Sequence, residues 1–176
     1  MRKLYVMDRD GSNPRSLSEP FERDVQGPRW AHDGSGIYFT AADHGNTGLY
    51  FIGLDGHLRR LAGDVGSGMS AYGGLGNFSV ANNGTFAVTC TRPNLPGDIA
   101  VGDSQSSSTR VLTQVNEGLL SGRTLGQVEE VWYESSKDHR KIQGWILKPP
   151  DFDPSKKYPL ILEIHGGPFE IGRAHV

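Results

Sequence analysis

Two adjacent glycines near the end of the chain stand where the backbone itself could take part in a reaction. They belong to the sequence His165-Gly166-Gly167-Pro168, which follows an apolar run at residues 158–164. Because glycine has no Cβ atom, a backbone N–H group there can come close to the carbonyl oxygen of a substrate. N–H donors held in that position stabilise the negative charge of a tetrahedral intermediate. The two glycines are therefore candidates for an oxyanion-hole loop.

A hairpin and a strand must bring this loop into place. Residues 128–135 and 141–148 alternate between apolar and polar side chains around a charged turn, which predicts an antiparallel hairpin. Residues 149–155 contain three prolines and predict an extended surface loop. The run 158–164 is the most hydrophobic in the chain and predicts a buried strand of a mostly parallel sheet. Such sheets bind ligands beyond the carboxyl ends of their strands, where the glycine pair lies.

Other patterns that could support chemistry are weaker. Residues 8–13 resemble a calcium loop, but their glycine is at the fourth position and not the sixth, so a hairpin turn is favoured. The six histidines lack the spacing of a metal site. No Gly-x-Ser-x-Gly sequence, which would mark a serine nucleophile, occurs in the chain. We therefore predict neither a metal nor a cofactor.

The part of the chain before this hairpin contains an internal repeat. Residues 4–11 and 49–56 both begin with Leu-Tyr and end with Asp-Gly, and residues 98–103 are a degenerate third copy. Between the copies, residues 29–39 and 77–88 share a second pattern, which is centred on an Asp-Gly or Asn-Gly pair. These pairs supply the positive φ angles of tight hairpin turns. The runs beside them are rich in the aromatic and β-branched residues that strands favour.

Four short strands that recur about every 40–50 residues are typical of β-propeller blades. We predict a mainly β protein, in which the C-terminal blades of a β-propeller occupy residues 1–120. The alternative is an antiparallel sandwich with irregular hairpins, but the strands of a sandwich need not repeat a motif.

Length, charge and cysteine content restrict the class of protein. The chain of 176 residues suggests one domain and a remainder. With 18 basic and 20 acidic residues and a net charge of −2, it lacks the basic excess of a nucleic-acid-binding protein. No apolar stretch reaches the ~18 residues of a membrane span. The single cysteine, Cys90, favours a reducing compartment and leads us to expect a cytoplasmic protein.

Two stretches of the sequence carry a family resemblance. The repeats are similar to the blades of Tol-B-like and peptidase propellers. Residues 126–169, and above all 144–150 and 156–168, resemble the beginning of the catalytic domain of the prolyl oligopeptidase family. The nearest branch is that of the acylaminoacyl-peptidases and dipeptidyl-aminopeptidase-like enzymes. The resemblance implies a propeller joined to an α/β-hydrolase domain, which would start within residues 121–169.

The same resemblance implies a function and roles for the glycines. The parent enzyme would be a serine-type peptidase that hydrolyses short peptides through an acyl-enzyme, and its propeller would limit substrate access. Gly167 would donate an oxyanion-hole N–H, and Gly166 would shape the turn. His165 stands where other branches carry a tyrosine, so that hydroxyl contribution does not carry over. The nucleophile, the acid and the base all follow this strand in the fold, so we expect the chain itself to be an inactive fragment.

Two alternative functions remain open at this point. One is a non-enzymatic Tol-B-like propeller that binds a protein partner, although such a protein does not need residues 126–169. The other is an esterase of the same fold, although esterases usually have a third glycine where Pro168 stands and lack a propeller. We also allow for a homo-oligomer of the full-length protein. Residues 170–176 resemble a translated sequencing adapter, and we exclude them from the fold.

Overall fold

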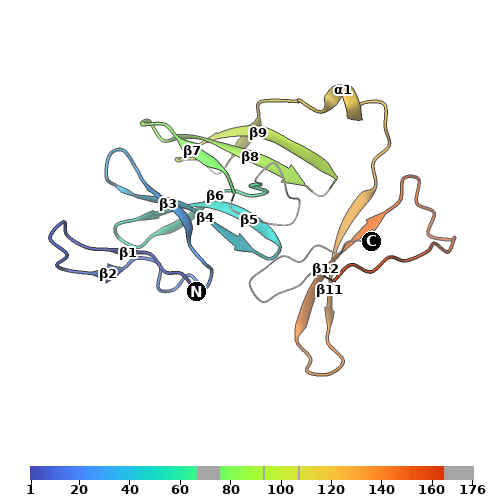
Figure 1. Cartoon of the computed structure of the whole chain (residues 1–176), viewed down its shortest axis with the longest axis horizontal. Helices are drawn as coiled ribbons and strands as arrows, with labels where there is room; N and C mark the ends of the chain where they lie inside the picture. Colours follow the sequence, from blue (N-terminus) through green and yellow to red (C-terminus); the bar gives the residue numbers. More distant parts are fainter. Residues whose placement is uncertain (67–75, 93, 107, 165–176) are drawn as a thin grey trace.

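The chain folds into a series of antiparallel sheets that follow one another along the sequence. The computed structural model describes residues 1–66, 76–92, 94–106 and 108–164. Within them, two four-stranded sheets stand between two hairpins (Figure 1). The first hairpin pairs β1 (Tyr5–Val6) with β2 (Arg15–Ser16), and the last pairs β11 (Gln127–Glu134) with β12 (Lys141–Lys148).

Each four-stranded sheet is a simple meander in which consecutive strands pair. The first sheet consists of β3 (Gln26–Trp30), β4 (Gly36–Asp43), β5 (Asn46–Gly53) and β6 (Leu58–Ala62). The second consists of β7 (Phe78–Val80), β8 (Thr85–Arg92), β9 (Leu95–Asp103) and β10 (Thr109–Val111). A short helix, α1 (Glu117–Leu120), lies on the connection from the second sheet to the last hairpin.

The repeated Asp-Gly and Asn-Gly pairs form the hairpin turns that the sequence predicts. The glycine of each pair has a positive φ angle, and the side-chain oxygen before it accepts a hydrogen bond from the backbone N–H two residues further on. The four glycines are Gly11, Gly34, Gly56 and Gly84, with φ between 72° and 86°. The four acceptors are Asp10, Asp33, Asp55 and Asn83, with N···O distances of 2.9–3.0 Å. The repeat in the sequence is thus a repeat in turn structure.

Both faces of the first sheet are buried, each in a separate apolar cluster. Phe39 and Tyr50 face the β1–β2 hairpin, where they pack with Leu4 and Leu17. Tyr38, Leu49 and Phe51 face the second sheet, where they pack with Phe86, Val88 and Ala100. Successive side chains of a strand point to opposite faces, so one strand serves both clusters. This series of regular four-stranded meanders, each packed on the next, is the arrangement of the propeller blades that the sequence predicts.

The C-terminal part confirms one sequence prediction and corrects another. Residues 127–148 form the predicted hairpin, with Gln127 opposite Lys148 and Glu134 opposite Lys141. The predicted buried strand at residues 158–164 is wrong for this structure, because these residues form no strand and Leu160 and Ile161 are each 87% exposed. A parallel strand needs neighbouring strands brought in by long crossovers. The described residues contain no such neighbours, since β11 and β12 pair only with each other.

Replacing a side chain in the cluster against the first hairpin should destabilise the protein strongly. Phe39 is fully buried, and its ring lies against Tyr50 and Phe21, with centroids 5.6 and 5.7 Å away. We expect Phe39→Ala to lower the free energy of unfolding by about 3–5 kcal/mol, because it leaves a cavity. Urea denaturation measures this loss. The exposed Tyr133→Ala should cost less than ~1 kcal/mol, and equal losses for the two variants would contradict the assigned core.

Candidate functional site

The glycines predicted for the oxyanion hole, Gly166 and Gly167, lie outside the described residues, as do His165 and residues 170–176. The structure therefore describes the segments that lead to that loop. These segments are the hairpin β11–β12 and the loop that follows it.

The loop after β12 is held by local polar contacts around one carboxylate. Oδ1 of Asp153 accepts hydrogen bonds from the Oγ and the backbone N–H of Ser155, at 2.7 and 2.9 Å. These two bonds lower the pKa of Asp153. The backbone N–H of Asp153 donates to the hydroxyl of Tyr158 at 3.0 Å, and the Tyr158 ring lies 5.1 Å from that of Phe152. The chain thus reaches residue 158 in a defined conformation.

The hairpin β11–β12 is attached to the turn between β4 and β5 in the first sheet. Nε2 of Gln143 donates to the backbone carbonyl of His44 at 2.9 Å and to Oε1 of Glu130 at 2.8 Å. Nε1 of Trp132 donates to the same carboxylate oxygen at 2.6 Å. The rings of Trp132 and His44 meet edge to face, with centroids 5.5 Å apart. One glutamate therefore fixes two of the side chains through which the hairpin touches the first sheet.

The β4–β5 turn is itself tightly determined. Its two central residues, His44 and Gly45, have φ angles of 49° and 70°, a conformation that favours glycine and is uncommon for other residues. Oδ1 of Asp43 accepts from Nε of Arg23 at 2.7 Å and lies 2.8 Å from Nδ1 of His44. Burial would raise the pKa of Asp43, but the hydrogen bond and charge of Arg23, with the charges of His44 and Arg60, lower it on balance. The carboxylate therefore stays ionised and anchors the turn.

A second turn of the blades touches the chain just before the hairpin. Nδ2 of Asn94, between β8 and β9, donates to the backbone carbonyl of Gly126 at 3.2 Å. The β4–β5 and β8–β9 turns occupy equivalent places in their two meanders. The same end of both sheets therefore supports the C-terminal segment, a contact that no sequence pattern indicated.

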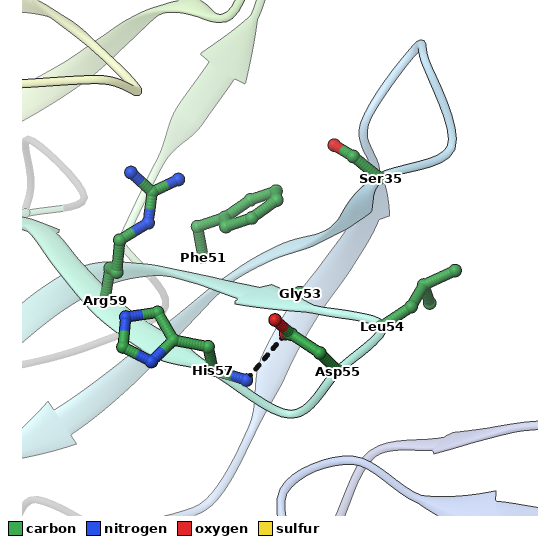
Figure 2. Close-up of a pocket in the computed structure, with 7 residues that line it drawn as sticks. All are labelled: Ser35, Phe51, Gly53, Leu54, Asp55, His57 and Arg59. Atoms are coloured by element: carbon green, nitrogen blue, oxygen red, sulfur yellow. Dashed lines mark hydrogen bonds between the residues drawn. The ribbon is translucent and has the colours of Figure 1, made fainter.

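The opposite end of the blades has a shallow pocket of about 330 Å³, which sequence reasoning missed. Figure 2 shows its lining residues around the β5–β6 turn, which are Ser35, Phe51, Gly53, Leu54, Asp55, His57 and Arg59. The polar groups that line this pocket make hydrogen bonds that stabilise the fold.

In this pocket, Oγ of Ser35 donates to Asp33 at 2.7 Å. Nη1 of Arg59 donates to the carbonyl of Ser104 at 2.9 Å, and its guanidinium lies 5.0 Å from the Phe51 ring centroid. Among the described residues that line this pocket, no hydrogen bond joins Ser35 to His57, so they show no activated nucleophile.

The described part of the chain contains no group of three or more His, Cys, Asp or Glu side chains that could hold a metal ion. The loop at residues 8–13 is the predicted hairpin turn, since Asp8 and Asp10 accept hydrogen bonds from Asn13 and Ser12. In the described part of the chain, no helix has the length and apolar character needed to span a membrane.

The contact between Trp145 and the β4–β5 turn can be tested with a pair of glycine variants. A Cβ atom on Gly45 would overlap the Trp145 ring, whereas one on Gly56 meets nothing within 4 Å. Both glycines have positive φ, so each change to alanine should cost about 1 kcal/mol of stability. Only Gly45→Ala should also shift tryptophan emission to longer wavelength, because it displaces the hairpin. The same emission spectrum for both variants would contradict this contact.

The ion pairs of Asp43 predict a dependence of stability on pH. Its pKa is lowered on folding, so its contribution is complete above the unfolded value of about 3.9 and is lost as the pH falls through the lower folded value. At pH 7, Asp43→Asn should lower the free energy of unfolding by about 0.5–1 kcal/mol. Below about pH 4 the difference should shrink. Chemical denaturation between pH 3 and 7 measures both curves, and parallel curves would disprove the assignment.

Several known proteins that resemble this chain are peptidases. Dipeptidyl-peptidase 5 of Porphyromonas gingivalis is 30% identical over 169 residues, which are 96% of this chain and 23% of that protein. The solved structure of an acylaminoacyl peptidase in complex with Z-Gly-Gly-Phe-chloromethyl ketone matches 94% of this chain and 23% of its own, with a TM-score of 0.69 at 20% identity. Prolyl oligopeptidase B from Galerina marginata matches 86% of this chain and 21% of its own, with a TM-score of 0.55 at 20% identity.

No protein-family profile matches the chain. The chain spans about a quarter of the length of the curated relatives that it matches. The sequence relationship extends over both the blades and the C-terminal hairpin, and the similar structures have the same fold over the same range. By sequence and by fold, the chain resembles the peptidases of the prolyl oligopeptidase family.

Proposed function

We propose that the chain is part of a serine-type peptidase that hydrolyses short peptides through an acyl-enzyme. A relative that matches 96% of the chain bears the name of a dipeptidyl-peptidase, and a structural neighbour binds a chloromethyl ketone built on a short peptide. Cys90 is the single cysteine, which supports a cytoplasmic location for the enzyme. No observation on the described residues favours a second function.

The observation that carries the proposal is the attachment of hairpin β11–β12 to the blade turns. Gln143 and Trp132 contact His44, and Asn94 contacts Gly126. The loop that contains the glycine pair follows this hairpin in the sequence, so the same end of the blades would face the catalytic site. Blades placed there would limit access to small substrates. A long or folded chain could not pass them.

Gly167 and Gly166 have a specific role in this proposal. The N–H of Gly167 donates to the oxyanion of the tetrahedral intermediate, and Gly166 lets the backbone turn towards the substrate. Donors of this kind stabilise the transition state by about 3–4 kcal/mol each in favourable cases. The nucleophile, base and acid come from parts of the longer enzyme beyond this chain.

The 176-residue chain on its own should therefore have no hydrolase activity. It has no Gly-x-Ser-x-Gly sequence, so a fluorophosphonate probe should not label it and dipeptidyl and acylaminoacyl substrates should remain intact. The longer product of the same gene should be labelled at one serine and should cleave those substrates. An active serine hydrolase in the same reaction serves as the positive control.

Three outcomes would count against the proposal. Stoichiometric labelling of the 176-residue chain would place a nucleophile within it. A longer product that cleaves esters but no peptides would identify an esterase. A longer product that is neither labelled nor active would favour the alternative of a non-enzymatic propeller that binds a protein partner.

A further inference from the structure

One of the repeated turns differs from the others in its chemistry. Asn83 precedes Gly84 in the turn between β7 and β8, whereas the equivalent positions of the other turns are aspartates, at Asp10, Asp33 and Asp55. Asn83 is also the only asparagine in the sequence that is followed directly by glycine. An amide in that position can react with the backbone, because glycine has no side chain to hinder the approach of its nitrogen.

The reaction that this pair allows is a deamidation, which needs only water. The backbone nitrogen of Gly84 bonds to Cγ of Asn83, and the bond from Cγ to Nδ2 breaks. The proton of the Gly84 N–H leaves with the amide as ammonia, and a cyclic imide remains. Water then opens the imide at either carbonyl. One opening gives aspartate, and the other gives isoaspartate, in which the main chain runs through the former side-chain carbon.

The structure leaves the side chain of Asn83 open to water. Asn83 is exposed, and its turn lies at the end of the second sheet away from hairpin β11–β12 (Figure 1). Its Oδ1 accepts a hydrogen bond from the N–H of Thr85 at 3.0 Å. Within the described residues, no hydrogen bond holds its Nδ2. The nitrogen that must leave is therefore in contact with solvent.

One contact of the folded turn slows the reaction without preventing it. The N–H of Gly84 donates to the carbonyl of Ala81 at 2.9 Å, and this bond must open before the nitrogen can attack. The turn is closed on one side by β7, which has only three residues (Phe78–Val80). Turns on short strands open locally at a lower cost in free energy than the core does.

The aspartates of the other turns are less reactive, and they show what the turn accepts. Hydrogen bonds from Ser12 and Ser35 lower the pKa of Asp10 and of Asp33. Both carboxylates are therefore ionised at neutral pH, and an ionised carboxylate resists attack by a nucleophile. Oδ1 of Asp33 accepts from the N–H of Ser35 at 3.0 Å, as Oδ1 of Asn83 does from its own neighbour. An aspartate at position 83 would make the same bond.

Isoaspartate would not fit this turn. It adds a methylene group to the main chain, so the turn no longer matches the pairing of Val80 with Phe86. The carbonyl of Gly84 also accepts from the N–H of Ser104 at 3.0 Å, and the carbonyl of Ser104 accepts from Nη1 of Arg59 at 2.9 Å. A shift of Gly84 therefore reaches the contact between the two four-stranded sheets.

We propose that Asn83 is a site of spontaneous deamidation, where aspartate preserves the β7–β8 turn and isoaspartate loosens it. The modification adds a negative charge to the end of the blades opposite the C-terminal hairpin. It therefore links the age of a molecule to the packing of its two sheets, and it does not depend on the proposed peptidase activity.

Incubation of the chain at neutral pH in heavy-oxygen water, followed by peptide mass spectrometry, tests the reaction. Asn83 should become acidic and acquire the oxygen label, with both isomers present after electron-based fragmentation. Asn82 is the matched control within the same peptide, because it is also exposed but precedes another asparagine. It should react several times more slowly. Urea should accelerate the reaction at Asn83, because it opens the turn. Equal rates at the two asparagines, or no effect of urea, would overturn the proposal.

The two products can be compared by urea denaturation. Asn83→Asp should show no further change of charge at this position and should unfold at the same urea concentration as the wild-type chain. The isoaspartate form, separated from aged protein by ion exchange, should unfold at a lower concentration. Equal midpoints for the isoaspartate form and the wild-type chain, or a variant Asn83→Asp as unstable as the isoaspartate form, would contradict the assigned effect on the turn.

Discussion

The burial of both faces of a single four-stranded sheet is the constraint on which the rest of this structure depends. A meander of four strands has two apolar faces here, and one sheet cannot cover both. Tyr50 and Ile52 are covered by the hairpin before the first sheet, whereas Leu49 and Phe51 are covered by the sheet after it. Each blade is therefore stable only between neighbours, which explains why the chain repeats one unit.

This stacking also determines which groups are available at each end of a blade. The Asp55-Gly56 turn is occupied by a hydrogen bond within the turn and by Arg15 of the preceding hairpin, which donates to the carbonyl of Leu54. The opposite turns, at His44 and Asn94, are left to contact the C-terminal segment. One end of the blades therefore forms mainly contacts between blades. The other end contacts the hairpin that leads to the glycine pair.

The ion pairs of Asp43 connect the segment before the first sheet with the turn that contacts the C-terminal hairpin. Arg23 comes from the segment before the first sheet, and His44 is part of the turn that contacts Trp132. The carboxylate is only partly exposed, so its charge is worth more to the fold than that of a free surface aspartate. Asp43 therefore stabilises the turn and so holds in place the His44 carbonyl that accepts the hydrogen bond from Gln143.

The amino-acid sequence by itself determined the local structure, because turns and strands depend on neighbouring residues. The Asp-Gly pairs predicted the hairpins, and the alternation of residues 128–148 predicted β11 and β12 with bounds within one residue of those observed. The Gly166–Gly167 loop remains a prediction from sequence. Only the tertiary structure decided the partners of Gln143, Asn94 and Arg59, which bond to backbone carbonyls far along the chain. Every residue has such a carbonyl, so no residue type reveals which one will be bound. For the same reason the apolar run at 158–164, which looks like a buried strand, is exposed where its neighbouring strands are absent from the described residues.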